Sequence, residues 1–320
     1  MITTKNNKIL FIAYSVFFGL FLLGCGNSTY SQTTEEIITD TSGESVEMFT
    51  PEPVSEQIDE TLTPQANLDT STPTPDVRIP PDQWQEWPII PDITNNAKAI
   101  FSIGKQKEVD STSFSKVGDC QNIKEAFLGI YDLEGRYFLR EDEKDWQETI
   151  ENFAGYFNKD GLAIEQGLNV AAVLSPLHAD PDVCRPSESP LLCELREANP
   201  SFAFISFERW WPKETPPDIY EKYLRIVIQT TIDNGTVPIL VTKADNVEGN
   251  HQINQIIAKL AYEFDIPLYN WWKAAQLLPH RGLDPERNDK FHISIEAWDT
   301  RSYYALETLN ALWKGLKNRQ

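Results

Sequence analysis

Basic residues are scarce in this sequence, and one long stretch contains none. The 320 residues carry 28 Lys and Arg against 48 Asp and Glu, a net charge of −20, and no basic residue occurs between Lys8 and Arg78. A protein that binds the phosphates of nucleic acid needs a basic face, so the composition excludes a nucleic-acid partner. It also excludes electrostatic adhesion to anionic lipid.

Long hydrophobic runs are also few, and the most prominent one is short. The stretch Ile9–Leu23 has about 15 residues, whereas a membrane-spanning helix needs roughly 20. Lys5 and Lys8 precede it, and no acidic residue occurs before Glu35. A basic start followed by a short apolar stretch is typical of a secretory signal. The sequence therefore predicts export.

The apolar stretch ends in Leu22-Leu23-Gly24-Cys25, which resembles the lipobox of bacterial lipoproteins. The resemblance implies that residues 1–24 are removed and that Cys25 is acylated and becomes the N-terminus. The lipid would then hold the protein on the extracytoplasmic face of a cell membrane. Cleavage leaves a net charge of −22, from 26 basic and 48 acidic residues. The alternative is an ordinary signal anchor with an incidental cysteine.

Cysteines are rare: the sequence has Cys25, Cys120, Cys184 and Cys193. In an exported chain, Cys184 and Cys193 are close enough along the sequence to predict a disulfide. A metal site at this pair is the competing interpretation, but His178 is the only histidine nearby. Cys120 is then the odd thiol. It is either buried and inert or used in chemistry.

Two segments follow the predicted signal. Residues 25–83 are rich in Ser, Thr, Pro and Glu and show no hydrophobic period, so we expect a disordered stalk. A flexible coil of this length spans about 40 Å, enough to hold a domain clear of lipid head groups. Residues 84–320 are long enough for one α/β domain.

Short apolar runs alternate with helical patterns through residues 84–320. The runs have strand length, and the helical patterns repeat apolar residues at a spacing near 3.6. This alternation predicts an α/β fold, a flavodoxin-like three-layer sandwich with helices on both faces of a parallel sheet. The predicted strands are 114–118, 201–207, 237–241 and 266–269, and the predicted helices are 141–158, 191–198, 218–233, 252–264 and 295–316.

Three features of the sequence could meet beyond the carboxyl ends of the strands, where open α/β sheets bind ligands. Cys120 follows the first strand, and we expect a helix to begin there and lower the pKa of the thiol. His292 could act as a general base, with Asp289 orienting it. The backbone amide of Gly167 could face a developing oxyanion. On spacing alone these signals are weak, because a lone histidine in a loop is more often a hydrogen-bonded surface residue.

The ordered set of these features resembles the SGNH/GDSL hydrolase family. Gly118-Asp119-Cys120 resembles the first family block, Gly-Asp-Ser, with the nucleophile at position 120. Gly167 falls where the second block supplies its glycine, and Asp289-Lys-Phe-His292 resembles the last block, Asp-x-x-His. The resemblance covers the domain but not the stalk. It implies a carboxylic ester hydrolase that acts on acyl esters of carbohydrate or lipid through a Cys-His-Asp site.

Two departures from the family pattern matter. The nucleophile is Cys120 instead of serine. The third block, Gly-x-Asn-Asp, is replaced by Glu208-Arg209-Trp210-Trp211, which lacks the side-chain oxyanion donor. Losing one such donor costs on the order of 10²–10³ in rate. Arg209 could replace it as a cationic donor.

The alternative function is a catalytically degenerate surface module that binds glycan. Trp210-Trp211 and Trp271-Trp272 motivate it, because aromatic faces stack on sugar rings, although packing explains Trp271-Trp272 better. No nucleotide-binding loop and no clustered metal-ligand pattern occur in the sequence, so we expect neither a cofactor nor a metal. We expect a monomer whose partners are its ester or glycan substrate and the membrane that holds its lipid.

Overall fold

The computed structural model describes residues 78–207 and 216–318. The predicted signal, Cys25 with its predicted acylation, and nearly all of the predicted stalk therefore lie outside the described residues, as do Arg209 and the pair Trp210-Trp211. Residues 78–320 make one compact unit. Within the described ranges, no helix combines the length and the apolar character that crossing a membrane requires.

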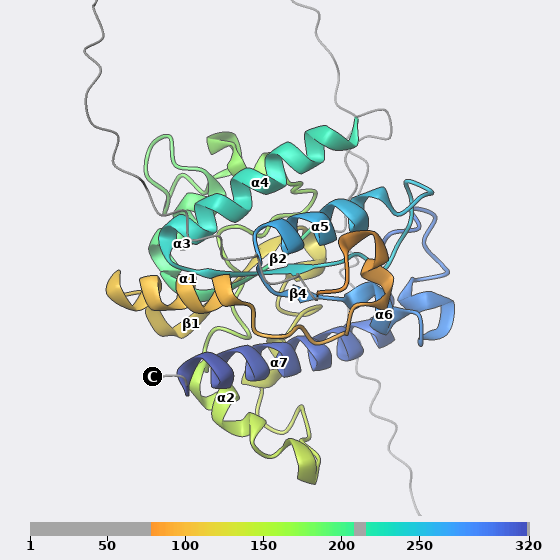
Figure 1. The fold of residues 1–320 in the computed structure, drawn as a ribbon, viewed down its shortest axis with the longest axis horizontal. Helices are drawn as coiled ribbons and strands as arrows, with labels where there is room; N and C mark the ends of the chain where they lie inside the picture. The colour runs from red at the N-terminus through yellow and green to blue at the C-terminus, as the bar shows by residue number, and fades with distance from the viewer. Residues whose placement is uncertain (1–77, 208–215, 319–320) are drawn as a thin grey trace, which may run out of the picture. The chain divides into compact units, whose positions relative to one another are not determined.

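Strands and helices alternate along the described chain (Figure 1). The strands are β1 (Asp110–Gly118), β2 (Pro200–Ser206), β3 (Val237–Val241) and β4 (Leu268–Tyr269). The helices are α1 (Asn95–Gln106), α2 (Trp146–Asn152), α3 (Pro190–Ala198), α4 (Pro217–Asn234), α5 (Gln252–Glu263), α6 (Trp271–Ala275) and α7 (Ile295–Lys317). Short 3₁₀ helices connect them: η1 (Pro81–Glu86), η2 (Cys120–Asn122), η3 (Gly129–Asp132), η4 (Glu141–Glu143), η5 (Ala172–Leu174), η6 (Pro176–His178) and η7 (Pro279–Gly282).

The four strands form one parallel sheet in the order β1-β2-β3-β4. Gly118 at the end of β1 pairs with Ser206 of β2, and it also forms an isolated parallel bridge with Ile164. Because a strand has only two edges, residue 164 lies on the side of β1 away from β2. In chain order, this arrangement matches the flavodoxin-like order 2-1-3-4-5, with the second strand reduced to a single bridge. The predicted α/β fold with a parallel sheet is confirmed.

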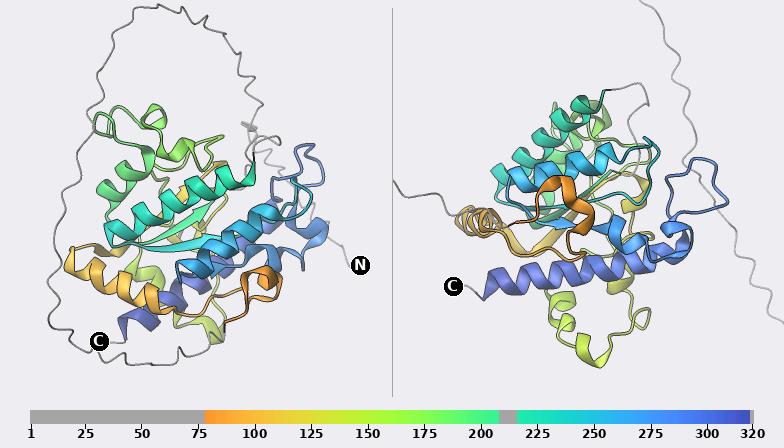
Figure 2. Two further views of the ribbon diagram at one scale, coloured as in Figure 1. Left: turned by 45° about the horizontal axis from the view of Figure 1, so that its top comes forward. Right: turned by 45° about the vertical axis from the view of Figure 1, so that its right-hand side comes forward.

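Helices cover both faces of the sheet. Helices α3, α4 and α5 lie on one face and α7 on the other, with α2 beyond α7 (Figures 1 and 2). Every residue of β2 and β3 is buried, as expected for parallel strands covered on both faces. Aromatic rings fill the core beside β1 and β2: Phe114, Phe153, Phe157, Phe202 and Phe204 are fully buried and contact one another at ring-centroid distances of 5.0–6.2 Å.

Local sequence signals determine where the long helices begin and end. Helix α4 begins at Pro217, whose fixed φ suits the first helical position, and ends before Gly235, which has a φ of +91°. The Ser294 side chain accepts a hydrogen bond from the Ala297 amide and so caps α7. Both ends agree with the sequence-based bounds to within a residue or two.

Two local predictions differ from the structure, and two helices had no prediction. The helix expected over residues 141–158 is only α2, because residues 141–143 form a 3₁₀ turn and the chain leaves helical geometry after Asn152. No α-helix begins at Cys120, where η2 has three residues. Helices α1 and α6 were not predicted at all.

Candidate active site

The candidate site lies at the carboxyl end of β1, where the strand order changes direction. From β1 the chain goes first to the bridge at Ile164 on one side and afterwards to β2 on the other. Ligands of open α/β sheets bind at such a switch point, beyond the carboxyl ends of the strands. Cys120 follows β1 immediately, so the fold places its side chain at this position.

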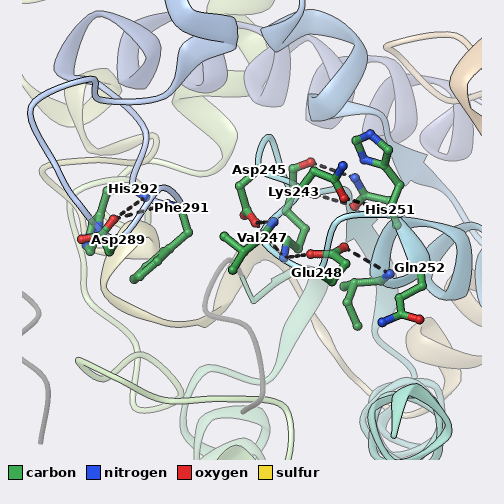
Figure 3. A network of polar contacts seen from close by, with 12 residues as sticks. Lys243, Asp245, Val247, Glu248, His251, Gln252, Asp289, Phe291 and His292 are labelled. Carbon is green, nitrogen blue, oxygen red and sulfur yellow. Dashed lines mark hydrogen bonds and ion pairs between the residues drawn. The ribbon is translucent and has the colours of Figure 1, made fainter. Parts of the chain in front are cut away.

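Side chains from two distant parts of the sequence meet there. The Sγ atom of Cys120 lies 3.7 Å from Nε2 of His292, although 172 positions separate the two residues. On the other side of the imidazole, Nδ1 lies 2.9 Å from Oδ2 of Asp289, as Figure 3 shows. The Oδ1 atom of Asp289 accepts the backbone amide of His292 at 3.3 Å. This arrangement places a sulfur, a base and an orienting carboxylate in line.

Electrostatics keep Asp289 ionised. Burial alone would raise its pKa, but the hydrogen bonds from the His292 ring and from the amides of Phe291 and His292 outweigh burial and lower it. A carboxylate beside Nδ1 favours the proton on that nitrogen, which leaves Nε2 as the acceptor facing Cys120.

Two expectations for Cys120 are wrong in this structure. It is not an unpaired cysteine: none of the described cysteines is free, and the Cys120 sulfur is itself part of a disulfide. Cys120 therefore carries a thiol only when the protein is reduced. The argument from a helix macrodipole also fails, because a three-residue 3₁₀ turn has no appreciable dipole.

Gln121, the neighbour of Cys120, ties the two parts of the site together. Its Oε1 accepts the amide of Ile293 at 2.8 Å, and its Nε2 donates to the carbonyl of Phe291 at 3.2 Å. The Gln121 side chain is buried and forms hydrogen bonds with the backbone on both sides of His292. The backbone amide of Gln121 donates to Oδ1 of Asp119 at 3.0 Å, which fixes the turn itself.

A fully buried guanidinium braces the same turn from α7. Arg301 donates to the carbonyl of Gln121 at 2.6 Å, to Oδ1 of Asn122 at 3.2 Å and to Oγ of Ser206 at 2.8 Å. Its guanidinium carbon also lies 4.3 Å from the ring centroid of Phe127. Arg301 thus connects α7 with the Cys120 turn and the end of β2.

The two predicted oxyanion donors beyond Cys120 have different outcomes. Gly167 lies just past the bridge at Ile164, and the amide of Glu165 donates to the Gly118 carbonyl at 3.4 Å. The φ of Gly167 is +81°, a conformation that favours glycine, and the Gly167 amide donates no hydrogen bond to any described residue. Arg209 lies outside the described residues.

A second buried charged cluster follows β3 (Figure 3). The Nζ atom of Lys243 lies 2.9 Å from Oδ1 of Asp245 and 3.1 Å from Oε2 of Glu248, and all three side chains are at most 1% exposed. Burial raises the pKa of Asp245 to about 6, although Lys243 opposes this shift. Within the described chain, Oδ2 of Asp245 has no hydrogen-bond partner. One buried lysine thus faces two buried carboxylates.

The disulfide predicted between Cys184 and Cys193 is present. Cys184 lies before α3 and Cys193 lies within it. Glu188, in the loop that the disulfide closes, forms an ion pair with Arg196 at 2.7 Å. The three groups Cys184, Glu188 and Cys193 lie close enough to surround an ion, but the bonded sulfurs cannot act as thiolate ligands. The competing metal interpretation is therefore not supported by these residues.

Trp271 and Trp272 are packing residues. Trp271 is fully buried, and Trp272 packs edge-on against Trp84 with 4.9 Å between ring centroids and against His251 with 5.6 Å. Trp271 therefore has no open face for sugar stacking, and Trp272 is half-buried. The glycan-binding alternative loses Trp271 from its basis, and Trp210-Trp211 lies outside the described residues.

Sequence reasoning missed Gln121, Arg301 and the Lys243 cluster. Signals for two of them were present. Arg301 lies on the face of α7 that carries Ala305, and a charge on an apolar helix face indicates a buried partner. Lys243 and Asp245 directly follow an apolar strand. Gln121 gave no signal, because its role depends on which loop folds against it.

Comparisons with known proteins give a distant structural likeness. No family model matches the sequence, and no curated protein matches it. Among solved structures, the chain is similar to a GDSL-like lipase from Bacteroides thetaiotaomicron, with 12% sequence identity and a TM-score of 0.39. The alignment covers 67% of this chain and 98% of the lipase chain.

Proposed function

We propose that this chain is an acyl-ester hydrolase in which reduced Cys120 is the nucleophile, His292 the general base and Asp289 the orienting carboxylate. The observation that carries the proposal is the continuous contact from Cys120 through His292 to Asp289 at the carboxyl edge of the sheet. Such a sulfur–imidazole–carboxylate series is the arrangement that activates a nucleophile.

The proposed reaction has two halves. His292 Nε2 takes the proton from Cys120 Sγ as the sulfur attacks the ester carbonyl carbon. The tetrahedral intermediate then collapses: the carbon–oxygen bond of the ester breaks, and Nε2 gives the proton to the departing alcohol. Water next attacks the thioester, with Nε2 accepting its proton and returning it to the sulfur, so that the acid leaves and the thiol is restored. The amides of Cys120 and Gly167, with Arg209 as a cationic donor, would hold the oxyanion.

The cellular setting belongs to the same proposal. Residues 1–24 would be a lipoprotein signal, and the lipid on Cys25 would hold the domain at the extracytoplasmic face on the stalk of residues 25–83. A lipid attached through the sulfur of Cys25 would make that sulfur unavailable for a disulfide. Because Cys184 and Cys193 pair with each other, Cys120 of a lipidated protein would be the thiol that catalysis needs.

Hydrolysis of p-nitrophenyl acetate by the purified protein tests the proposal. We expect activity after reduction, and we expect kcat/KM to fall by about 10²–10⁴ in Cys120→Ala and in His292→Ala. Asp289→Asn should lose activity with little change in KM, because Asp289 acts through His292.

His178→Ala is the matched control. This histidine also pairs with a carboxylate, Glu165 at 3.3 Å, but it is exposed on η6. Its replacement should leave activity unchanged. Hydrolysis that survives both Cys120→Ala and His292→Ala would eliminate the proposed function.

A further inference from the structure

A groove lined by tyrosines lies between α7 and the segment that follows η3. We call it the tyrosine groove. It has a volume of about 370 Å³, within the range of small-molecule sites. The residues used below are Tyr131, Tyr137, Arg140, Asp299, Tyr303 and Tyr304.

Both walls of the groove continue from the candidate active site. Helix α7 begins three residues after His292, and η3 begins nine residues after Cys120. The two walls are joined where the amide of Leu128 donates to Oγ of Ser302 at 2.9 Å. In Figure 1 the yellow-green segment that leads to α2 lies beneath α7. The α7 wall of the groove thus adjoins the Cys120 turn, because Arg301 on the same helix donates to the Gln121 carbonyl at 2.6 Å.

The tyrosine rings of the groove form two pairs, with interplanar angles of 63° and 79°. Tyr131 and Tyr137 pack edge to face with 5.3 Å between centroids, and Tyr303 and Tyr304 do so at 5.2 Å. Tyr137 and Tyr304 are half-buried, so each ring is fixed by a neighbour and still partly open. Fixed, partly open rings offer apolar contact area at low entropic cost.

One hydroxyl in the groove is available to a ligand. Tyr131 lines the groove and is 8% exposed, and no hydrogen bond joins its hydroxyl to another described residue. The hydroxyl oxygen is not one of the described buried atoms that lack a partner, so it reaches solvent in the groove. The hydroxyl of Tyr303, in contrast, donates to Oε1 of Glu143 at 2.6 Å and accepts from Arg140 at 2.7 Å.

The charges of the groove do not favour an ion. Arg140 is paired with Asp142 and Glu143, and Asp299 on the other wall is exposed and acidic. The whole chain carries a net charge of −20, which repels anions. The tyrosine rings, the Tyr131 hydroxyl and the Asp299 carboxylate together suit a ligand with apolar ring faces and neutral hydroxyl groups.

We propose that the tyrosine groove binds a neutral saccharide and holds the sugar part of an ester substrate beside the Cys120–His292 pair. Saccharide binding by the groove does not depend on the proposed hydrolase, whereas the position of the sugar beside Cys120 and His292 rests on the proposed function. The proposal names carbohydrate, instead of lipid, as the class of substrate. The rings that would stack on the sugar are these tyrosines and not the Trp271-Trp272 pair.

Calorimetric titration tests the binding, with cellopentaose, chitopentaose, maltopentaose and xylopentaose as the ligands. We expect saturable binding of at least one of them by the wild-type protein and equally by His292→Ala. Tyr131→Phe removes only the phenolic hydroxyl and should weaken binding about fivefold, the loss expected for one hydrogen bond. Tyr304→Ala should weaken binding about tenfold or more.

Tyr223→Ala is the control, because this half-buried tyrosine lies on α4, on the opposite face of the sheet. It should bind as the wild type does. Absence of saturable binding for all four saccharides, or equal affinity in Tyr304→Ala and the wild type, would overturn the proposal. Binding by a wild-type protein that hydrolyses no ester would reject the enzyme and leave the groove as a saccharide site.

Discussion

At the scale of single residues, the candidate site depends on a side chain with no chemistry of its own. Gln121 holds the backbone at Phe291 and Ile293, and His292 lies between these two contacts. The imidazole is therefore fixed to the same turn that carries Cys120. A general base must lie within hydrogen-bonding distance of its proton donor, and small misplacements are costly in rate.

Gln121→Leu should lower kcat by roughly tenfold to a hundredfold with little change in KM, because His292 would no longer be held against Cys120. It should also lower the free energy of unfolding by about 2–4 kcal/mol, since two buried backbone groups lose their partners. Ester kinetics and urea unfolding measure the two effects. Gln147→Leu, on the exposed face of α2, is the control. Unchanged kcat in Gln121→Leu would show that the contact does not position His292.

Asp245 predicts a pH dependence of stability. Burial raises the pKa of its carboxyl to about 6 in the folded protein, against an ordinary value of about 3.9. Between these values the folded state retains a proton that the unfolded state releases, so this group's contribution to stability falls as pH rises from about 4 to about 6. Asp245→Asn has no such proton. Its stability relative to wild type should therefore improve between pH 4 and pH 7, as measured by urea unfolding. A difference that is constant over this range would contradict the shift.

At the scale of elements, the end of β1 and the end of β2 approach too closely for any side chain at position 118. A Cβ atom on Gly118 would lie 1.8 Å from the carbonyl oxygen of Ser206 and 2.3 Å from Nδ2 of Asn122. The turn that presents Cys120 can form only because this residue is glycine. Arg301 then supports the same turn from α7.

Gly118→Ala should lower the free energy of unfolding by on the order of 3 kcal/mol, because the clash involves backbone and cannot be relieved by a side-chain rotation. Gly135→Ala is the matched control. It has a φ of +70° but no atom within 4 Å of the added Cβ, so only backbone strain of about 1 kcal/mol is expected. Equal losses in thermal or urea unfolding would indicate that the close approach is not decisive.

Elements with a clear hydrophobic period were predictable, and those set by tertiary contacts were not. Helix α4 has apolar residues at helical spacing between Pro217 and Gly235, so its bounds follow from local chemistry. The segment 141–158 has a similar pattern but breaks after Asn152, where the carboxylate of Asp132 binds the amides of Gly155 and Asn158. The positions of Cys120, His292 and Asp289 in the sequence suggested one site, while the contacts of Gln121 depended on loop packing.

At the scale of the whole molecule, the fold combines an acidic chain with a buried parallel sheet and a covalent crosslink near α3. The pair Cys184–Cys193 closes a loop of nine positions. A crosslink stabilises mainly by restricting the unfolded chain, and the effect is moderate for so short a loop.

The double variant Cys184→Ala/Cys193→Ala should be less stable than the wild type by about 2–3 kcal/mol in the chain-entropy account. Urea unfolding without reductant measures the difference. The double variant lacks the Cys184–Cys193 bond. Adding reductant to it therefore measures separately how reduction at Cys120 changes the stability. A double variant as stable as the wild type would mean that the crosslink does not contribute to stability.

The most direct test of the account is to identify the acylated residue. Reduced protein is mixed briefly with p-nitrophenyl acetate, quenched in acid and analysed by peptide mass spectrometry. The account predicts one acetyl group per chain, carried as a thioester on Cys120 and accumulating further in a variant that deacylates slowly, such as Asp289→Asn. Turnover of the ester with no acetyl on Cys120 in either protein would contradict it.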